Sequence, residues 1–282
     1  MPYSFLILSL LIISASSKEW KQWSCDEVTP NLCELHVEKG SVMIQSIPVH
    51  YWRYSRADKN DESNSSISQP IIALHGGPGW PHTYLLPLKQ LACREDIISE
   101  VIFYDQAGCG KSIVPKINAS TTTTTTPVQD EYPHLLDPAY YSEIELPTLI
   151  DHWKLPRYHI LGHSWGTILA QLFALNSNAT DGLQSLILSG PISNAKAYID
   201  AQWDPTDTNN LASLPPFVQH RIHALEEENA YDTSEYKAIE EVLSTFFTMR
   251  TNPVPDCFEE SAEGVNEEIY VGMQGASEFT IR

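Results

Sequence analysis

The segment from Tyr158 to Ala170 reads YHILGHSWGTILA, and it sets the framework for the rest of the chain. An apolar run leads into the five residues GHSWG, and a second apolar run with helical spacing follows them. A G-x-S-x-G pattern between a strand and a helix marks a sharp, strained turn that lifts the serine hydroxyl above a sheet. Gly162 and Gly166 supply the small residues needed where strand and helix nearly touch. The segment therefore predicts Ser164 as a nucleophile at a helix N-terminus, where backbone N–H groups stabilise negative charge.

Short strands alternate with helices on both sides of this segment. Further strands are predicted at Ile71–Leu74, Val101–Tyr104 and Leu183–Leu188. The stretch Tyr140–Trp153 has mostly helical spacing, with an irregularity expected at Pro147. Alternating polarity from Leu32 to Tyr54 predicts antiparallel strands that lead into the fold. This order predicts an α/β protein with a doubly wound, mostly parallel sheet and functional residues at the carboxyl ends of its strands.

The pattern changes after Gly190. Residues 191–275 lack short β-branched strands and are rich in helical spacing, which predicts an inserted helical cap over the sheet edge. Within it, two helices are expected on either side of residues 231–234, the second capped by Asp232 or Ser234. The domain prediction is a core over residues 18–190, this cap, and the start of a return to the core over residues 276–282.

Composition and the N-terminus indicate the compartment. The 282 residues carry a net charge of −19, which argues against nucleic acid and anionic membranes as partners and is compatible with cationic small substrates. Residues 1–17 have no charged side chain and an apolar stretch too short to span a bilayer, so they predict a cleaved signal peptide and a secreted protein without a membrane anchor. Sequons at Asn64, Asn118 and Asn178 predict glycosylation and fit this route.

The five cysteines fit the same compartment. Cys25 and Cys33 are close enough in sequence to close a short N-terminal loop by a disulfide. Because the count is odd, one cysteine is free or pairs outside the chain. No Cys or His spacing indicates a metal site, and no cofactor is expected.

Two glycine-rich stretches follow predicted strands. HGGPG (75–79) lets the backbone approach a tetrahedral intermediate, and the N–H groups of Gly77 and Trp165 are the expected oxyanion donors. AGCGKS (107–112) looks like a phosphate-binding loop, but Asp105 stands where that pattern requires glycine. We interpret this second stretch as a structural turn beside the active site.

Four motifs carry a family resemblance: LHGGPG, YDQAGCGKS, LGHSWGTILA and the late GASEF. They resemble those of proline iminopeptidases and related amino-acid amidases of the α/β-hydrolase superfamily, from about Ile71 to the last residue. The resemblance implies a serine aminopeptidase that releases an N-terminal residue, often proline, from small peptides or amides with a free N-terminus. It also implies that acidic residues hold the substrate's ammonium group, with Glu278 as the first candidate and Glu227 as the second. The chain has Trp80 where the family often has glycine.

The sequence offers no clear candidates for the Asp or Glu and the His that would complete a catalytic triad with Ser164. In this superfamily an Asp or Glu and then a His follow the serine, and after Ser164 the histidines are His220 and His223, both in the cap. We therefore expect a C-terminally truncated form that lacks the final strands and helices and is impaired in catalysis. Two alternatives stay open: a secreted esterase or amidase, and a non-catalytic protein on a hydrolase fold. The oligomeric state is left open.

Overall fold

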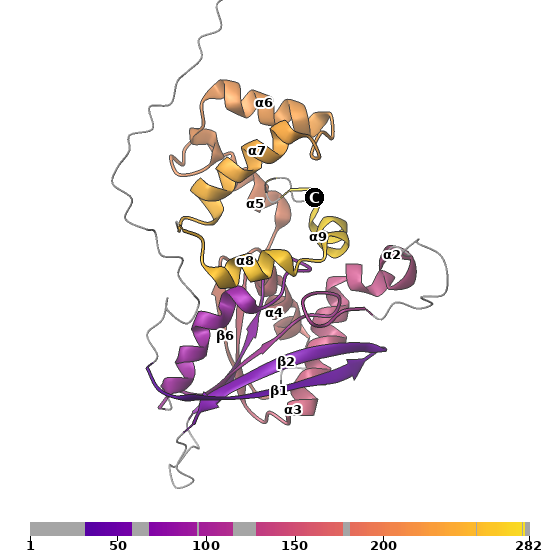
Figure 1. Ribbon diagram of the computed structural model, residues 1–282, viewed down its shortest axis with the longest axis vertical. Coiled ribbons are helices and arrows are strands. Elements are labelled where there is room, and N and C mark those ends of the chain that lie inside the picture. Colours follow the sequence, from indigo (N-terminus) through magenta and orange to yellow (C-terminus); the bar gives the residue numbers. More distant parts are fainter. Residues whose placement is uncertain are drawn as a thin grey trace, which may run out of the picture.

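A computed structural model describes residues 32–57, 68–94, 96–114, 128–176, 181–251, 253–277 and 279 (Figure 1). The predicted signal peptide and the three sequon residues Asn64, Asn118 and Asn178 lie outside the described residues. No helix among the described residues is both long and apolar enough to cross a membrane.

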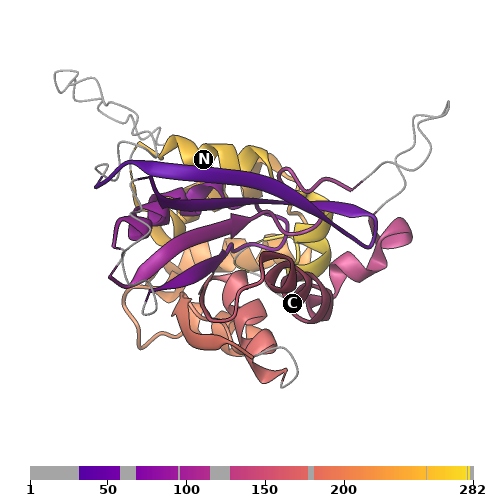
Figure 2. The same ribbon diagram turned by 90° about the horizontal axis from the view of Figure 1, so that it is seen from below.

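A six-stranded sheet in the order β1-β2-β4-β3-β5-β6 forms the centre of the fold. Its strands are β1 Leu35–Ile44, β2 Ile47–Arg56, β3 Gln69–Leu74, β4 Ile98–Tyr104, β5 Tyr158–His163 and β6 Leu183–Ser189. The first two strands form an antiparallel hairpin, which Figure 2 shows lying across one side of the molecule, and β2 pairs antiparallel with β4. The remaining neighbours pair in parallel, which confirms the predicted α/β fold with a mostly parallel sheet.

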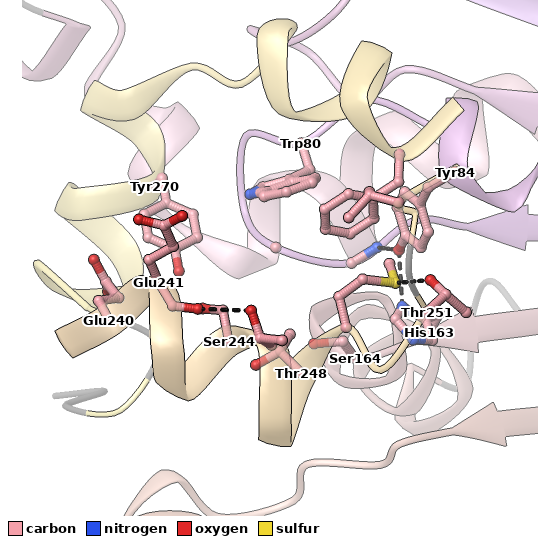
Figure 3. A pocket seen from close by; sticks show the side chains of 16 residues that line it. Trp80, Tyr84, His163, Ser164, Glu240, Glu241, Ser244, Thr248, Thr251 and Tyr270 are labelled. Carbon is pink, nitrogen blue, oxygen red and sulfur yellow. Dashed lines mark hydrogen bonds between the residues drawn. The ribbon is translucent and has the colours of Figure 1, made fainter. Parts of the chain in front are cut away.

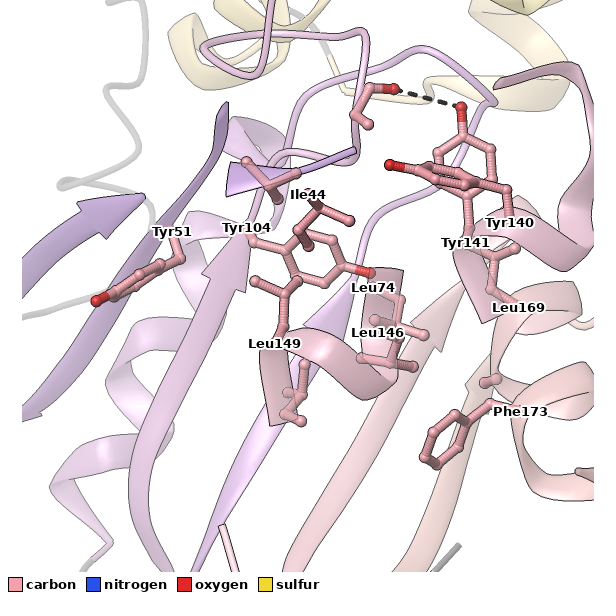
Figure 4. Packing of buried hydrophobic residues seen from close by; sticks show 14 of the residues in the cluster. Ile44, Tyr51, Leu74, Tyr104, Tyr140, Tyr141, Leu146, Leu149, Leu169 and Phe173 are labelled. Carbon is pink, nitrogen blue, oxygen red and sulfur yellow. Dashed lines mark hydrogen bonds between the residues drawn. The ribbon is translucent and has the colours of Figure 1, made fainter. Parts of the chain in front are cut away.

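Alternate residues of the central strands enter two separate cores. In β3, Ile72 and Leu74 belong to a large cluster that includes side chains of α3 (Leu146–Trp153) and α4 (Trp165–Leu175), part of which Figure 4 shows. Ile71 and Ala73 of β3 belong to a second cluster that includes side chains of η1 (Thr83–Cys93). Because the side chains of a strand point alternately to opposite faces, both faces of the sheet are covered, as a doubly wound fold requires.

The predicted helix over Tyr140–Trp153 is irregular, but the irregular turn comes before Pro147 and not at it. Residues Tyr140–Glu145 form a π-helical turn, and α3 begins at Leu146 with Pro147 in its first turn. Proline is tolerated there because the first N–H groups of a helix have no intrahelical partner.

The C-terminal helices have two different packing environments. Helices α5 (Ala195–Gln202), α6 (Pro216–Glu227) and α7 (Ser234–Leu243) lie beyond the sheet in Figure 1. In this part Leu211, Ile222, Leu243 and Phe279 form a small core of their own. By contrast α8 (Asp256–Glu263) packs against η1 of the main core, and α9 (Glu267–Gln274) follows it. Phe279 lies in the segment that was expected to return to the core, but its side chain packs in the small core of the cap.

Smaller elements complete the chain: α2 Val128–Glu131, η2 Pro133–Leu136, η4 Leu211–Ser213 and η5 Ser244–Thr248.

Two local predictions are wrong. Helix α7 is capped by Thr233, whose Oγ1 accepts a hydrogen bond from the Tyr236 N–H at 3.2 Å, and not by Asp232 or Ser234. Several residues around this position have side chains suited to capping, so the pattern alone did not select one. Cys33 is bonded to Cys93 and not to Cys25, because the hairpin brings the start of β1 beside the end of η1. The expected unpaired cysteine is Cys109, which is buried.

One fully buried carboxyl connects the π-helical turn to the loop after β4. Glu145 Oε2 accepts a hydrogen bond from the Ala107 N–H at 2.8 Å, while Oε1 has no partner among the described residues. Burial raises the pKa of Glu145 to about 8, although the bond from Ala107 works in the opposite direction. A carboxyl with this pKa is mostly protonated at neutral pH, so the folded protein holds a proton that the unfolded chain releases.

This proton gives a testable pH dependence. The pKa of Glu145 is higher in the folded state than its ordinary 4.5, so its contribution to stability is present at low pH and is lost as the pH rises through about 8. Between pH 5 and pH 9 the free energy of unfolding should fall by roughly 3–5 kcal/mol because of Glu145 alone. Urea unfolding at both pH values should show that E145Q, which keeps an acceptor for Ala107, loses less stability than the wild type. Equal losses in the two proteins would contradict the assignment.

Candidate active site

Ser164 lies at a turn between β5 and α4, and the glycines that flank this turn are closely packed. Its backbone has φ +50° and ψ −120°, a conformation that residues other than glycine rarely adopt. A Cβ added to Gly162 would lie 2.4 Å from the Gly166 carbonyl oxygen, and one added to Gly166 would lie 2.3 Å from the Leu74 carbonyl oxygen. The predicted need for glycine at both positions is therefore confirmed.

Hydrogen bonds hold this turn on both sides. The Ser164 N–H donates to the carbonyl of Ser189 at the end of β6, at 2.9 Å. The Ser164 carbonyl accepts from the N–H of Thr167 at 2.8 Å and from its hydroxyl at 2.6 Å. Such surrounding contacts are what keeps a strained backbone in place, so the position of Ser164 is fixed by its neighbours.

The HGGPG loop after β3 lies directly against this turn. A Cβ on Gly76 would be 2.9 Å from Ser164 Cβ, and Gly77, at φ +49°, is covered by the ring of Trp80. Among the described residues, the N–H groups of Gly77 and Trp165 make no hydrogen bond. The structure thus places both predicted oxyanion donors beside Ser164 and leaves both amides without a protein partner in the described chain.

His75 fixes this loop to the turn after β4. Its Nε2 accepts from the Gln106 N–H at 3.0 Å, and Nδ1 lies 3.2 Å from the Gly76 carbonyl. Burial lowers the pKa of His75 to about 4, so the ring is neutral and Nδ1 donates to Gly76. His75 is completely buried and serves as a positioning residue.

The AGCGKS stretch is a structural turn organised by Asp105. One carboxylate oxygen of Asp105 accepts from the His82 N–H at 3.0 Å and lies 2.7 Å from His82 Nδ1, while the other accepts from the Lys111 N–H at 2.8 Å. Burial works to raise the pKa of Asp105, but the bonds from His82 and Lys111 leave it below its ordinary value. The amide of Lys111 is therefore used within the protein.

The corner between α8 and α9 connects both loops. Ser261 Oγ accepts from the Tyr84 N–H at 2.9 Å and lies 2.6 Å from Thr83 Oγ1. Asn266 donates from its backbone N–H to Gly79 at 2.9 Å and from its side chain to Gly108 at 2.7 Å. This corner belongs structurally to the active site, although the sequence pattern assigned it to the cap.

A pocket of about 570 Å³ opens above Ser164 (Figure 3). Its apolar wall includes Trp80 and Phe258, whose ring centroids are 5.3 Å apart. Its other wall comes from α7 and η5 and contributes Glu240 and Glu241, which Figure 3 shows across the pocket from Ser164. No lysine or arginine is among the described residues that line it. The pocket therefore suits a small ligand that is partly apolar and positively charged.

Glu240 is the more enclosed of the two carboxylates. Burial raises its pKa, whereas a hydrogen bond from Ser277 and the charge of Lys237 lower it. Ser277 is itself buried and also bonds to Tyr236. A partly desolvated carboxylate gains more from a cationic ligand than an exposed one does.

Of the two predicted ammonium-binding residues, the structure describes one, Glu227. Glu227 is exposed on α6 and is not among the residues that line the pocket, and Glu278 lies outside the described residues. Sequence reasoning missed Glu240 and Glu241 because a glutamate pair in a Glu-rich helix normally indicates a solvated face. Which face of α7 meets the pocket depends on tertiary packing.

All ten histidines of the sequence lie in the described residues, and of these His163 alone lines the pocket. Of the two late histidines, His223 contacts Trp203 with ring centroids 4.4 Å apart and a tilted geometry, and its Nδ1 lies 3.3 Å from Glu226 Oε2. Neither His223 nor His220 lines the pocket. Ser164 Oγ has no hydrogen-bond partner among the described residues. Among the described residues, no histidine is therefore hydrogen-bonded to the Ser164 hydroxyl.

Comparison with known proteins identifies the family of the chain. Residues 69–224 match the family model of the alpha/beta hydrolase fold. The chain is 37% identical over 224 residues to a proline iminopeptidase of Heyndrickxia coagulans, covering 79% of this chain and 68% of that protein. It is 31% identical over 216 residues to a proline iminopeptidase of Lactobacillus acidophilus, covering 76% and 66%. The matches thus span about two thirds of these relatives.

Solved structures show the same fold. The crystal structure of VinJ superposes with a TM-score of 0.67 at 23% identity, covering 87% of this chain and 73% of that one. A proline iminopeptidase of Mycobacterium smegmatis superposes with a TM-score of 0.64 at 24% identity, covering 86% and 73%.

The crowding under Ser164 predicts a large effect of one methyl group. G166A should lower the free energy of unfolding by about 3 kcal/mol, because its Cβ would meet fixed backbone. G190A is the control: its Cβ has nothing within 4 Å, and only its φ of +62° opposes alanine, which costs about 1 kcal/mol. Denaturant unfolding of both variants measures the difference, and equal losses would show that the segments are not in close contact.

Proposed function

Because the chain belongs to the α/β-hydrolase fold family, in the branch that contains the proline iminopeptidases, we propose that it is a serine aminopeptidase of the proline iminopeptidase type. It would release an N-terminal residue, often proline, from a small peptide or amide. The observation that carries this proposal is Ser164 at a strained turn, facing the free amides of Gly77 and Trp165 at the base of an acidic pocket.

The proposed reaction is acyl transfer through Ser164. The Ser164 hydroxyl loses its proton to a base and its oxygen attacks the carbonyl carbon that follows the N-terminal residue. The oxyanion accepts hydrogen bonds from Gly77 and Trp165, the peptide or amine leaves with a proton, and water then hydrolyses the acyl-enzyme. In this proposal Ser164 is the nucleophile and Gly77 and Trp165 are the oxyanion donors, and His163 is the one histidine among the described residues that line the pocket.

Acidic side chains in the cap would hold the substrate's ammonium group. Glu240 and Glu241 line the pocket, so we add them to Glu278, which the family resemblance implies. Ser277, the neighbour of Glu278 in sequence, bonds to Glu240. A cation held on this wall, with the carbonyl at Ser164, would restrict cleavage to the first residue of a chain.

We place the protein in the secreted compartment, on the basis of the predicted signal peptide and sequons. The disulfide between Cys33 and Cys93 supports this placement, because disulfides persist in oxidising compartments.

Assay of a proline arylamide tests the reaction. We expect slow turnover that S164A reduces to background, because a serine site without its base loses about 10⁴–10⁶ in kcat. Turnover as fast as that of a complete proline iminopeptidase would contradict the missing base. Equal cleavage of the N-acetylated arylamide would favour the esterase or amidase alternative, and no Ser164-dependent turnover would favour the non-catalytic one.

Binding of L-prolinamide tests the ammonium site without requiring turnover. E240Q or E241Q should weaken binding about 10- to 100-fold, because a charge-assisted hydrogen bond is lost. The exposed Glu227 provides the matched control, and E227Q should bind as the wild type does. Calorimetric titration with N-acetylprolinamide, which lacks the cation, should show no dependence on these glutamates. The carboxylate assignment would be wrong if E240Q and E241Q bound L-prolinamide normally.

A further inference from the structure

We propose that Tyr84 holds His163 as a hydrogen-bond donor toward the pocket, with the proton on Nε2, and so excludes His163 as the general base. The Tyr84 hydroxyl accepts from the Gly76 N–H at 2.5 Å and lies 2.8 Å from His163 Nδ1. Figure 3 shows Tyr84 and His163 joined by this bond beside Ser164. Tyr84 is thereby a positioning residue for both the HGGPG loop and the residue that precedes the nucleophile.

Counting protons assigns the tautomer. A phenol has one proton to donate, and a backbone N–H is always a donor. If Nδ1 of His163 carried a proton, the Tyr84 oxygen would face two donors and its own proton would have no acceptor among the described residues. The Tyr84 side chain is partly buried, and a hydroxyl that is removed from water without gaining an acceptor is costly. Tyr84 therefore donates to Nδ1, and the His163 proton resides on Nε2.

Burial keeps both groups in the required protonation states. It raises the pKa of Tyr84 far above neutrality, although the bond from Gly76 opposes this, and it lowers the pKa of His163. The two rings also pack edge to face with centroids 5.3 Å apart, which limits rotation of the imidazole. At neutral pH the pair is thus an intact phenol and an uncharged imidazole.

This arrangement determines what His163 offers to a ligand. A general base for Ser164 needs an unprotonated nitrogen directed at the hydroxyl, and the unprotonated nitrogen of His163 is bonded to Tyr84. Nε2 has no protein partner among the described residues, and His163 lines the pocket. Its N–H would bind an acceptor oxygen of the ligand, such as a carbonyl oxygen. This last step rests on the proposed function, whereas the tautomer does not.

Nitrogen NMR of protein labelled with ¹⁵N-histidine tests the tautomer directly. We expect His163 to show an unprotonated Nδ1 and a protonated Nε2. In Y84F the donor to Nδ1 is lost, and the ring should shift to a mixture of tautomers. The half-buried His159, whose Nδ1 lies 2.7 Å from Ser185 Oγ, is the internal control and should be unchanged in Y84F. A proton on Nδ1 of His163 in the wild type would overturn the proposal, even if Y84F did not fold.

Addition of L-prolinamide separates this inference from the proposed function. The Nε2–H signal of His163 should move on binding, while that of His159 should not. A ligand that binds without moving the His163 signal would contradict the donor role. Failure of the wild type to bind L-prolinamide would contradict the proposed function, and the tautomer of the free protein would still decide the Tyr84–His163 inference.

Discussion

Three backbone segments meet under Ser164 with no room for a side chain, and the rest of the site depends on this contact. The end of β3, the end of β5 and the first turn of α4 approach so closely that an added Cβ at Gly162 or Gly166 would overlap carbonyl oxygens. Between the strand and the helix, Ser164 adopts a positive φ of +50°. A conformation of this kind costs about 1–2 kcal/mol, and the surrounding sheet offsets that cost. The packing of these segments therefore fixes the position of Ser164, which lines the pocket.

The oxyanion loop is held from several sides, which explains why the site is organised without a ligand. His75 bonds the loop to the turn after β4, and Tyr84 bonds it to His163 beside Ser164. Asn266, between α8 and α9, bonds to Gly79 of the loop. Each of these side chains is used by the protein itself, whereas the amides of Gly77 and Trp165, the proposed oxyanion donors, have no hydrogen-bond partner among the described residues. Preorganised donors of this kind lower the barrier of acyl transfer because they need no rearrangement during the reaction. The part of the cap that carries Glu240 packs around a small core of its own, separate from the two clusters on the sheet.

Features set by neighbouring residues could be predicted from the sequence, and features set by tertiary packing could not. The GHSWG and HGGPG stretches could be recognised because glycines follow a short apolar run in each, and the buried strands follow from such runs. The partner of Cys33 depends on the β1–β2 hairpin lying beside η1, which no spacing encodes. The role of Glu240 depends on which face of α7 meets the pocket. The capping of α7 by Thr233 was missed for another reason, because neighbouring residues have equivalent capping chemistry.

The most direct measurement is a crystal structure of the protein after prolonged treatment with a fluorophosphonate. The structural account predicts phosphorus bonded to Ser164 Oγ, with one phosphoryl oxygen about 2.7–3.1 Å from the N–H groups of both Gly77 and Trp165. A covalent adduct with that oxygen directed away from these amides would contradict the central claim. Modification of a different residue, with Ser164 left free, would contradict it as well.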